Sequence, residues 1–201
     1  LMERMEQGVE LDAGQEKVFK DLKTLFTGEE GEWEKLQSPY EGVEMEIKKK
    51  DQQGKKIGIA LGKAVGTADC TAEEAAAWYF EYCSRERLKI DSEEGNPAKL
   101  EIKRDSDRIN EKHFAAIKKM PILLHNREFV FKHLWKINED ESVSLALMPV
   151  DNEVDYGGGM GRLIKGTTKA LFTATNNQNT GSTGSKVPQC TMKLLQYGDA
   201  G

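Results

Sequence analysis

Two neighbouring apolar stretches between residues 120 and 150 constrain the fold more than any other feature of the sequence. Apolar and polar residues alternate along both, and a polar turn, residues 138–141, separates them. Alternation with a period of two is typical of strands that bury one face, so we expect an antiparallel hairpin. The inner face carries more aromatic rings than a thin sandwich needs, which suggests that it lines a space larger than ordinary side-chain packing requires. The residues of this face are Phe129, Phe131, His133 and Trp135 on the first strand and Val143, Leu145 and Leu147 on the second.

Charge and cysteine content exclude several classes of protein. The chain has 201 residues and a net charge of −5, without the basic excess that attracts a nucleic-acid backbone. Its three cysteines are odd in number and far apart, which indicates reduced thiols in a cytosol-like compartment. We see no signal peptide core and no apolar run long enough to span a membrane. We therefore expect a cytoplasmic protein that does not bind nucleic acid.

The remaining chain predicts a sheet with helices set to one side. Residues 1–13 form a frayed lead-in, and residues 14–201 form one domain. A capping box at Thr71 and Glu74 begins a helix that ends near Ser84, and the charged stretch 85–91 predicts no element of its own. An amphipathic helix over residues 15–26 packs on the sheet. Further strands are expected in residues 33–50 around a break at Ser38-Pro39, from Ile57 after a turn at 51–54, and over 99–104, 112–120, 162–175 and 190–197. The fold class is therefore α+β, with about nine antiparallel strands.

Motifs of catalysis or metal binding are not found. Histidines 113, 125 and 133 do not have the spacing of a zinc site, and no two cysteines are separated by two residues. The glycines of residues 157–161 do not form a phosphate-binding loop, and no Gly-x-Ser-x-Gly motif exists. We expect no metal, no cofactor and no catalytic residue.

The segment that opens the central hairpin is similar to a known family. Pro121, then Asn126-Arg127-Glu128-Phe129-Val130, and then Trp135 resemble a segment of the START domains, the lipid-transfer domains related to the steroidogenic acute regulatory protein. Other features follow in the family's order: the region of Trp33, a helix over 73–87, two long loops at 151–161 and 176–189, and the segment Tyr197–Gly201.

This resemblance implies a helix-grip fold, in which a long curved antiparallel sheet encloses one lipid beneath a C-terminal helix. The expected ligand is one sterol or glycerophospholipid, taken up during transient contact with membranes. The family continues beyond its aspartate-glycine motif into the roofing helix, whereas this sequence stops at Gly201. We therefore expect that helix to be missing here, which would leave the inner face more exposed than soluble monomers usually allow.

The resemblance also supplies candidate ligand-binding residues. His133 stands where sterol-binding members place a buried arginine, and Phe114 stands near the position of its acidic partner. Arg87 and Asp91 reproduce the Arg-x-x-x-Asp spacing of phosphatidylcholine-binding members, although a surface salt bridge would explain that pair equally well. The hairpin adds further candidates for the apolar wall: Phe129, Phe131, Trp135, Leu145 and Leu147.

The loop 151–161 is the candidate gate. Glycines 158 and 159 permit a change of backbone conformation, while Val154, Tyr156 and Met160 could enter a membrane surface. Two other functions stay open. An enzyme of the cyclase or aromatase type would need acid–base groups in the cavity, for which the sequence offers His133, His113 and Tyr197. A regulatory or interaction module would have a ligand-sensing or a collapsed pocket.

Overall fold

The computed structural model describes residues 5, 8–27, 32–49, 59–103, 108–121, 124–151, 153–177 and 187–199. The turn expected at 51–54 and most of the second long loop lie outside these residues. The elements in chain order are α2 (Ala13–Thr27), β1 (Glu34–Leu36), β2 (Val43–Lys49), β3 (Ile59–Ala68), α3 (Ala72–Phe80), α4 (Arg85–Glu93), β4 (Ala98–Ile102), β5 (Glu111–Lys118), β6 (Arg127–Ile137), β7 (Val143–Pro149), β8 (Ile164–Lys165), β9 (Thr167–Asn176) and β10 (Cys190–Asp199). In the described part of the chain, no helix is both long enough and apolar enough to cross a membrane.

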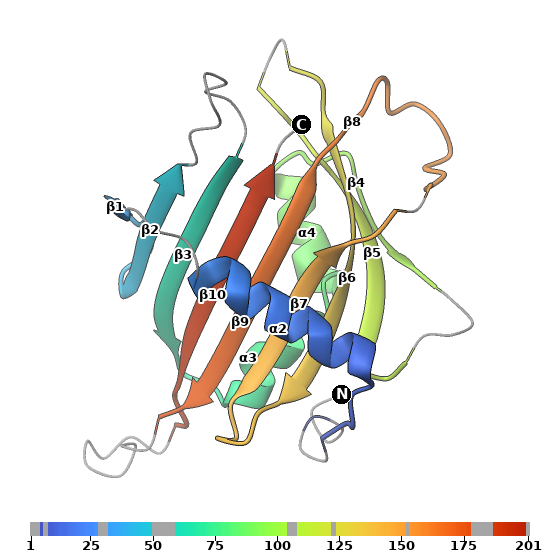
Figure 1. Ribbon diagram of the computed structural model, residues 1–201. Helices are drawn as coiled ribbons and strands as arrows, with labels where there is room; N and C mark the ends of the chain where they lie inside the picture. The colour runs from blue at the N-terminus through green and yellow to red at the C-terminus, as the bar shows by residue number, and fades with distance from the viewer. Residues whose placement is uncertain are drawn as a thin grey trace.

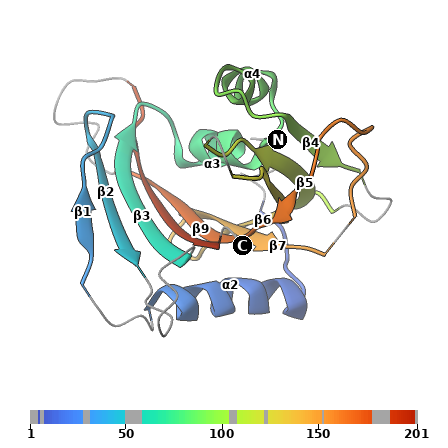
Figure 2. The same cartoon turned by 90° about the horizontal axis from the view of Figure 1, so that it is seen from above.

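The strands form one ten-stranded sheet with the order β1-β2-β3-β10-β9-β7-β6-β5-β4. All pairings are antiparallel except that of β8, a two-residue strand that runs parallel to β6. The sheet curves strongly, with α3 and α4 on its concave side and α2 across its convex side (Figures 1 and 2). This architecture confirms the predicted α+β class and the curved antiparallel sheet.

The central hairpin forms as predicted, with the expected residues on its inward face. Trp135 pairs with Leu145 and His133 with Leu147, so their side chains share the concave face. The turn is closed by the Asn138 N–H, which donates to the Ser142 carbonyl over 2.8 Å. The alternation of apolar residues therefore identified both the strands and the face that they turn inward.

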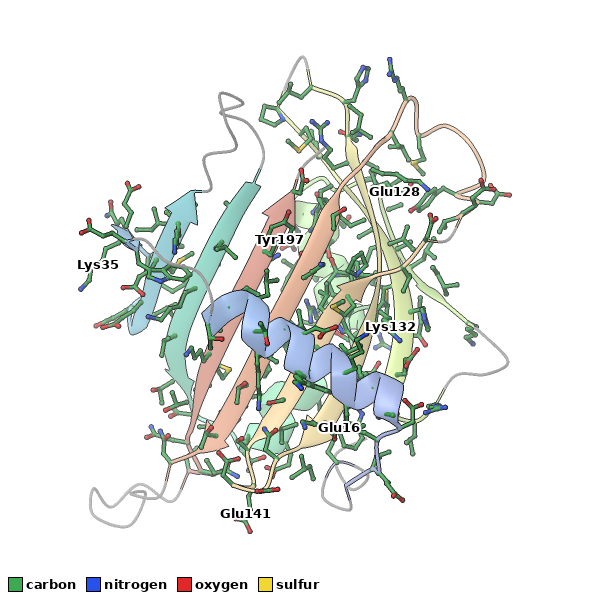
Figure 3. The ribbon with its side chains drawn as sticks, viewed as in Figure 1. Glu16, Lys35, Glu128, Lys132, Glu141 and Tyr197 are labelled. Carbon is green, nitrogen blue, oxygen red and sulfur yellow. The ribbon has the colours of Figure 1, made fainter. Side chains whose placement is uncertain are left out.

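Helix α2 covers the convex face because its apolar stripe matches an apolar strip of the sheet. Phe19 and Leu22 are each 1% exposed and pack against residues of β6, β7 and β9. At the N-terminus of the helix, the Asp12 carboxylate accepts a hydrogen bond from the Gln15 N–H at 2.8 Å. On the polar side, Glu16 pairs with Lys136 of β6 at 3.2 Å, and Figure 3 shows Glu16 on this side.

The N-terminal lead-in takes part in the core. Met5 is completely buried in a cluster with Trp135, Val143 and the alanines of α3. Val9 packs against the same cluster. Met5 and Val9, in the segment expected to fray, are therefore packed against the core.

Helix α3 has the predicted capping box, whereas the chain after it differs from expectation. The Thr71 hydroxyl accepts from the Glu74 N–H, and the Glu74 carboxylate accepts from the Thr71 N–H. The helix ends at Phe80 rather than near Ser84, and the charged stretch that follows folds into α4. The buried residue of α4 is Asp91, so this helix contacts the rest of the protein through a polar residue. A search for apolar residues at helical spacing therefore does not detect it.

Candidate functional site

A cavity of about 510 Å³ lies on the concave face, between the α3–α4 corner and the sheet. This volume suits a small molecule or part of a lipid. Its floor is largely apolar, with Ala116, Phe129, Phe131 and Leu147 from β5, β6 and β7. Its polar groups come from the α3–α4 corner and from the strands on either side of this floor: Tyr79, Tyr82, Arg87, Lys118, Thr168, Gln196 and Asp199.

Arg87 is the main charged group among the polar residues that line this cavity. One of its guanidinium nitrogens donates to the carbonyls of Trp78 and Tyr79, at 3.2 and 2.9 Å. The guanidinium also lies 4.6 to 5.6 Å from the ring centroids of Trp78, Tyr79 and Tyr82, within the range of cation–π attraction. Burial lowers the pKa of Arg87. Arg87 is thus fixed by rings and main-chain carbonyls, and no ion pair with a carboxylate is found for it among the described residues.

Asp91 has different partners from those the sequence suggested. Its carboxylate accepts from Lys118 at 2.5 Å, from Asn96 at 2.8 Å and from Lys99. Burial would raise the pKa of Asp91, but the hydrogen bonds from Lys118 and Lys99 outweigh it and the pKa is lowered. Arg87 and Asp91 line a common groove beside the cavity without forming the expected pair.

His133 lies beneath the cavity and does not line it. The ring is 1% exposed and has five aromatic rings around it, those of Tyr79, Phe80, Tyr82, Phe114 and Phe131. Its Nδ1 lies 3.3 Å from the Phe80 carbonyl oxygen, which can only accept, so Nδ1 carries the proton. Burial, opposed by this hydrogen bond, lowers the pKa of His133 to about 3. His133 is therefore a neutral core histidine.

The other predicted wall residues divide into two groups. Phe129, Phe131 and Leu147 line the cavity. Phe114 is completely buried beside Phe131, and Trp135 and Leu145 are covered by α3 in the main core cluster. Because α3 fills one end of the concave face, the cavity occupies the other end. Contact of any of these residues with a ligand stays a prediction.

The groups that could serve an enzyme do not meet in the cavity. Tyr197 alternates with Gln196 and Gly198, which line the cavity, so it points to the convex face, where Figure 3 shows it. His113 lies on that same face, 3.5 Å from Glu111. No cluster of three metal-binding side chains is present in the described part of the chain.

Several lining residues escaped the sequence analysis. Tyr79 and Tyr82 belong to the apolar stripe after the capping box, so helical periodicity alone could have placed them over the sheet. Thr168, Gln196 and Asp199 come from strands that meet only in the folded sheet, and no local pattern marks them. Gln196 donates to the Thr168 hydroxyl at 3.2 Å, which joins β10 to β9 at the cavity floor.

The glycine loop leaves the sheet at the cavity end. β7 ends at Pro149, which pairs with Phe131 of the cavity wall, and the loop follows it. Glycines 157, 158, 159 and 161 all have positive φ. Tyr156 is partly buried, and burial together with the nearby Glu128 carboxylate raises its pKa. Glu128 lies on the convex side of β6 (Figure 3), so Tyr156 of the loop lies near that side of the sheet. Its role as a gate stays a prediction.

Comparison with solved structures supports the fold. Similar structures include human StAR-related lipid transfer protein 5, with a TM-score of 0.61, 14% identity, and coverage of 94% of this chain and 81% of that chain. Human STARD10 follows with a TM-score of 0.59, 14% identity, and coverage of 96% and 70%. The lipid transfer and protein localization domain of human StarD13 has a TM-score of 0.56, 14% identity, and coverage of 96% and 85%. This chain has the START fold. No family model and no curated protein matches its sequence.

The START fold confirms the helix-grip architecture that the resemblance implied. At 14% identity, the comparison establishes the fold and leaves the ligand to the chemistry of the cavity itself.

Proposed function

We propose that this chain binds one glycerophospholipid in the concave cavity and transfers it between membranes. The observation that carries the proposal is the state of Arg87, a cation fixed in an aromatic setting at the edge of an apolar floor. Taking a charge out of water is costly unless it acquires a counter-charge. An anionic phosphate would supply that counter-charge, while the acyl chains cover the phenylalanine rings. Each buried methylene contributes about 0.8 kcal/mol, so the floor provides affinity and the charged groups provide selectivity.

Two features favour a phospholipid over a sterol. A sterol hydroxyl needs one or two buried polar partners, but His133 is enclosed by rings and Phe114 stands near the expected acidic position. The cavity wall instead offers Arg87 to an anion. The spacing of Arg87 and Asp91 supports the same choice in a modified form, because Asp91 neutralises the two lysines and leaves the arginine to the ligand.

A carrier function is favoured over catalysis by the ionisable groups of the cavity. Burial raises the pKa of Tyr79 to about 12, and burial followed by Asp91 raises that of Tyr82 as well. Both hydroxyls therefore stay protonated and suit hydrogen-bond donation to a ligand rather than proton transfer near neutral pH. Lipid transfer, which the names of two of the similar structures state, supports the same proposal. Transient membrane contact from the cytoplasm completes it.

Binding to lipid vesicles tests the proposal. Arg87→Ala should weaken phosphatidylcholine binding by about 1–2 kcal/mol, about 5- to 30-fold, and leave cholesterol binding unchanged. Arg85→Ala is the matched control, because Arg85 lies on the same helix and is exposed. Thermal unfolding of both variants shows whether the fold is intact. Equal phosphatidylcholine binding by wild type and a folded Arg87→Ala would contradict the proposed headgroup site.

A further inference from the structure

Two of the three cysteines meet away from the ligand-binding floor. The Sγ atoms of Cys70 and Cys190 are 3.7 Å apart, although the residues are 120 positions apart in the sequence. Cys70 directly precedes Thr71, the N-cap of α3, and Cys190 is the first residue of β10. Cys190 pairs with Ala68 of β3, two residues before Cys70. The sheet register and the cap of α3 therefore bring the two thiols together.

The two thiols differ in their access to solvent. Cys190 is completely buried, whereas Cys70 is partly exposed. Cys70 also lines a second cavity of about 420 Å³ between α3 and the strands β3 and β10. A small oxidant can therefore reach Cys70 before Cys190. Burial, and then contact with Cys70, raises the pKa of Cys190 to about 12, so this thiol is protonated when the oxidant arrives.

We propose that Cys70 and Cys190 form a peroxide-sensitive thiol pair. The Cys70 thiolate attacks hydrogen peroxide, which oxidises its sulfur to a sulfenic acid and releases hydroxide. The Cys190 sulfur then attacks the Cys70 sulfur, and the sulfenic hydroxyl leaves as water with the proton of Cys190. The hydroxide takes up the proton that Cys70 lost on ionising, so in sum two thiols and one peroxide give one disulfide and two waters. The sulfurs must approach to a bond length of about 2.05 Å, which the existing contact makes a short movement.

The cross-link would fix α3 to the sheet. The Ala72 N–H at the start of this helix already donates to the Asn176 side chain of β9 at 2.8 Å. A covalent bond at Cys70 would add a second tie, to β10. Because Tyr79 of α3 lines both cavities, oxidation would restrain the wall that they share. The bond also closes a long loop in the unfolded chain, which raises the stability of the oxidised protein.

Thiol mapping of the purified full chain tests the pair. Reduced protein is treated with one equivalent of hydrogen peroxide, alkylated with N-ethylmaleimide and digested without reductant. We expect a cross-linked Cys70–Cys190 peptide, an alkylated Cys83, and an intact monomer lighter by two hydrogens. The melting temperature should rise by on the order of 10 °C, and dithiothreitol should reverse the rise.

Cysteine variants provide the controls. Cys83→Ser should keep the cross-link, because this cysteine packs beside the first cavity. Cys70→Ser should abolish it and is partly exposed, so it disturbs the core less than a change at Cys190. Peroxide that leaves Cys190 alkylatable in wild type, or a cross-link that contains Cys83 or joins two chains, would overturn the proposal.

Discussion

Acid should destabilise this protein through His133. The ring is 1% exposed, and burial lowers its pKa from 6.5 to about 3. In the unfolded chain the ring is in water and has a pKa of about 6.5. Between these two values the unfolded state binds a proton that the folded state does not bind. The free energy of unfolding therefore falls as the pH falls below about 6.5, and this loss is complete near pH 3.

The size of the effect follows from the difference between the two pKa values. Each pH unit inside this window changes the free energy of unfolding by about 1.4 kcal/mol. Between pH 7 and pH 5 the free energy of unfolding should fall by about 2 kcal/mol because of His133. The fall is less than two full units' worth because the pH unit from 7 to 6 spans the pKa of the unfolded chain. Urea unfolding at the two pH values measures the loss directly.

His133→Gln removes the titrating group and keeps a donor for the Phe80 carbonyl. Between pH 7 and pH 5 the free energy of unfolding of the wild type should fall by about 2 kcal/mol more than that of the variant. His125→Gln, at an exposed position, should behave as the wild type. The same loss in wild type and His133→Gln would refute the reasoning, because it would mean that the folded protein accepts a proton at this ring.

Four further changes probe the cavity and its surroundings. Gly166→Ala places a Cβ about 2.7 Å from a ring atom of the phenylalanine that floors the cavity, so it should cost about 1–3 kcal/mol in stability and weaken lipid binding. Gly198→Ala adds its methyl where nothing lies within 4 Å and should leave stability unchanged; equal effects in calorimetry would contradict this account. Asp91→Asn leaves Lys99 without its counter-charge and Lys118 with Glu94 alone, so it should cost about 3 kcal/mol by urea unfolding, and a loss below about 1 kcal/mol would show that solvent already screens the lysines. Replacing Gly158 and Gly159 together by alanine should slow transfer between vesicles without changing equilibrium binding, and an unchanged transfer rate would exclude the gating role.

The sheet was predictable because its strands obey a local rule. Alternation along residues 127–149 identifies both strands of the central hairpin and their inward faces, and the register of Trp135 with Leu145 agrees. The capping box at Thr71 and Glu74 placed the start of α3 for a similar reason, since two reciprocal hydrogen bonds are encoded within four residues.

The division of the concave face was not predictable in the same way. Alternation shows that Phe129 and Trp135 point inward, but it cannot show that α3 covers Trp135 and leaves Phe129 at the cavity. The stretch that forms α4 has few apolar residues, and its buried contact is an ion pair with lysines of β4 and β5. Such partners are distant in sequence, so no local pattern reports them.

The same reason explains the outcome at Arg87 and Asp91. Their spacing indicated a pair, and the spacing is compatible with one turn of helix. Lys99 and Lys118, on strands of the sheet, donate hydrogen bonds to the Asp91 carboxylate. The Arg87 guanidinium instead lies against the rings of Trp78, Tyr79 and Tyr82. The partners of a charged residue depend on which side chains the tertiary fold brings near it, and the local sequence does not contain that information.

Mass spectrometry of lipid carried by the purified protein tests the central claim most directly. The chain is incubated with mixed vesicles of phosphatidylcholine and cholesterol, separated from them, and measured under native conditions and after solvent extraction. A matched variant, Ala116→Trp, fills the cavity from its floor. The proposed function predicts one phosphatidylcholine per wild-type chain and none in the folded variant. An empty wild-type chain, or equal lipid in both proteins, would contradict it.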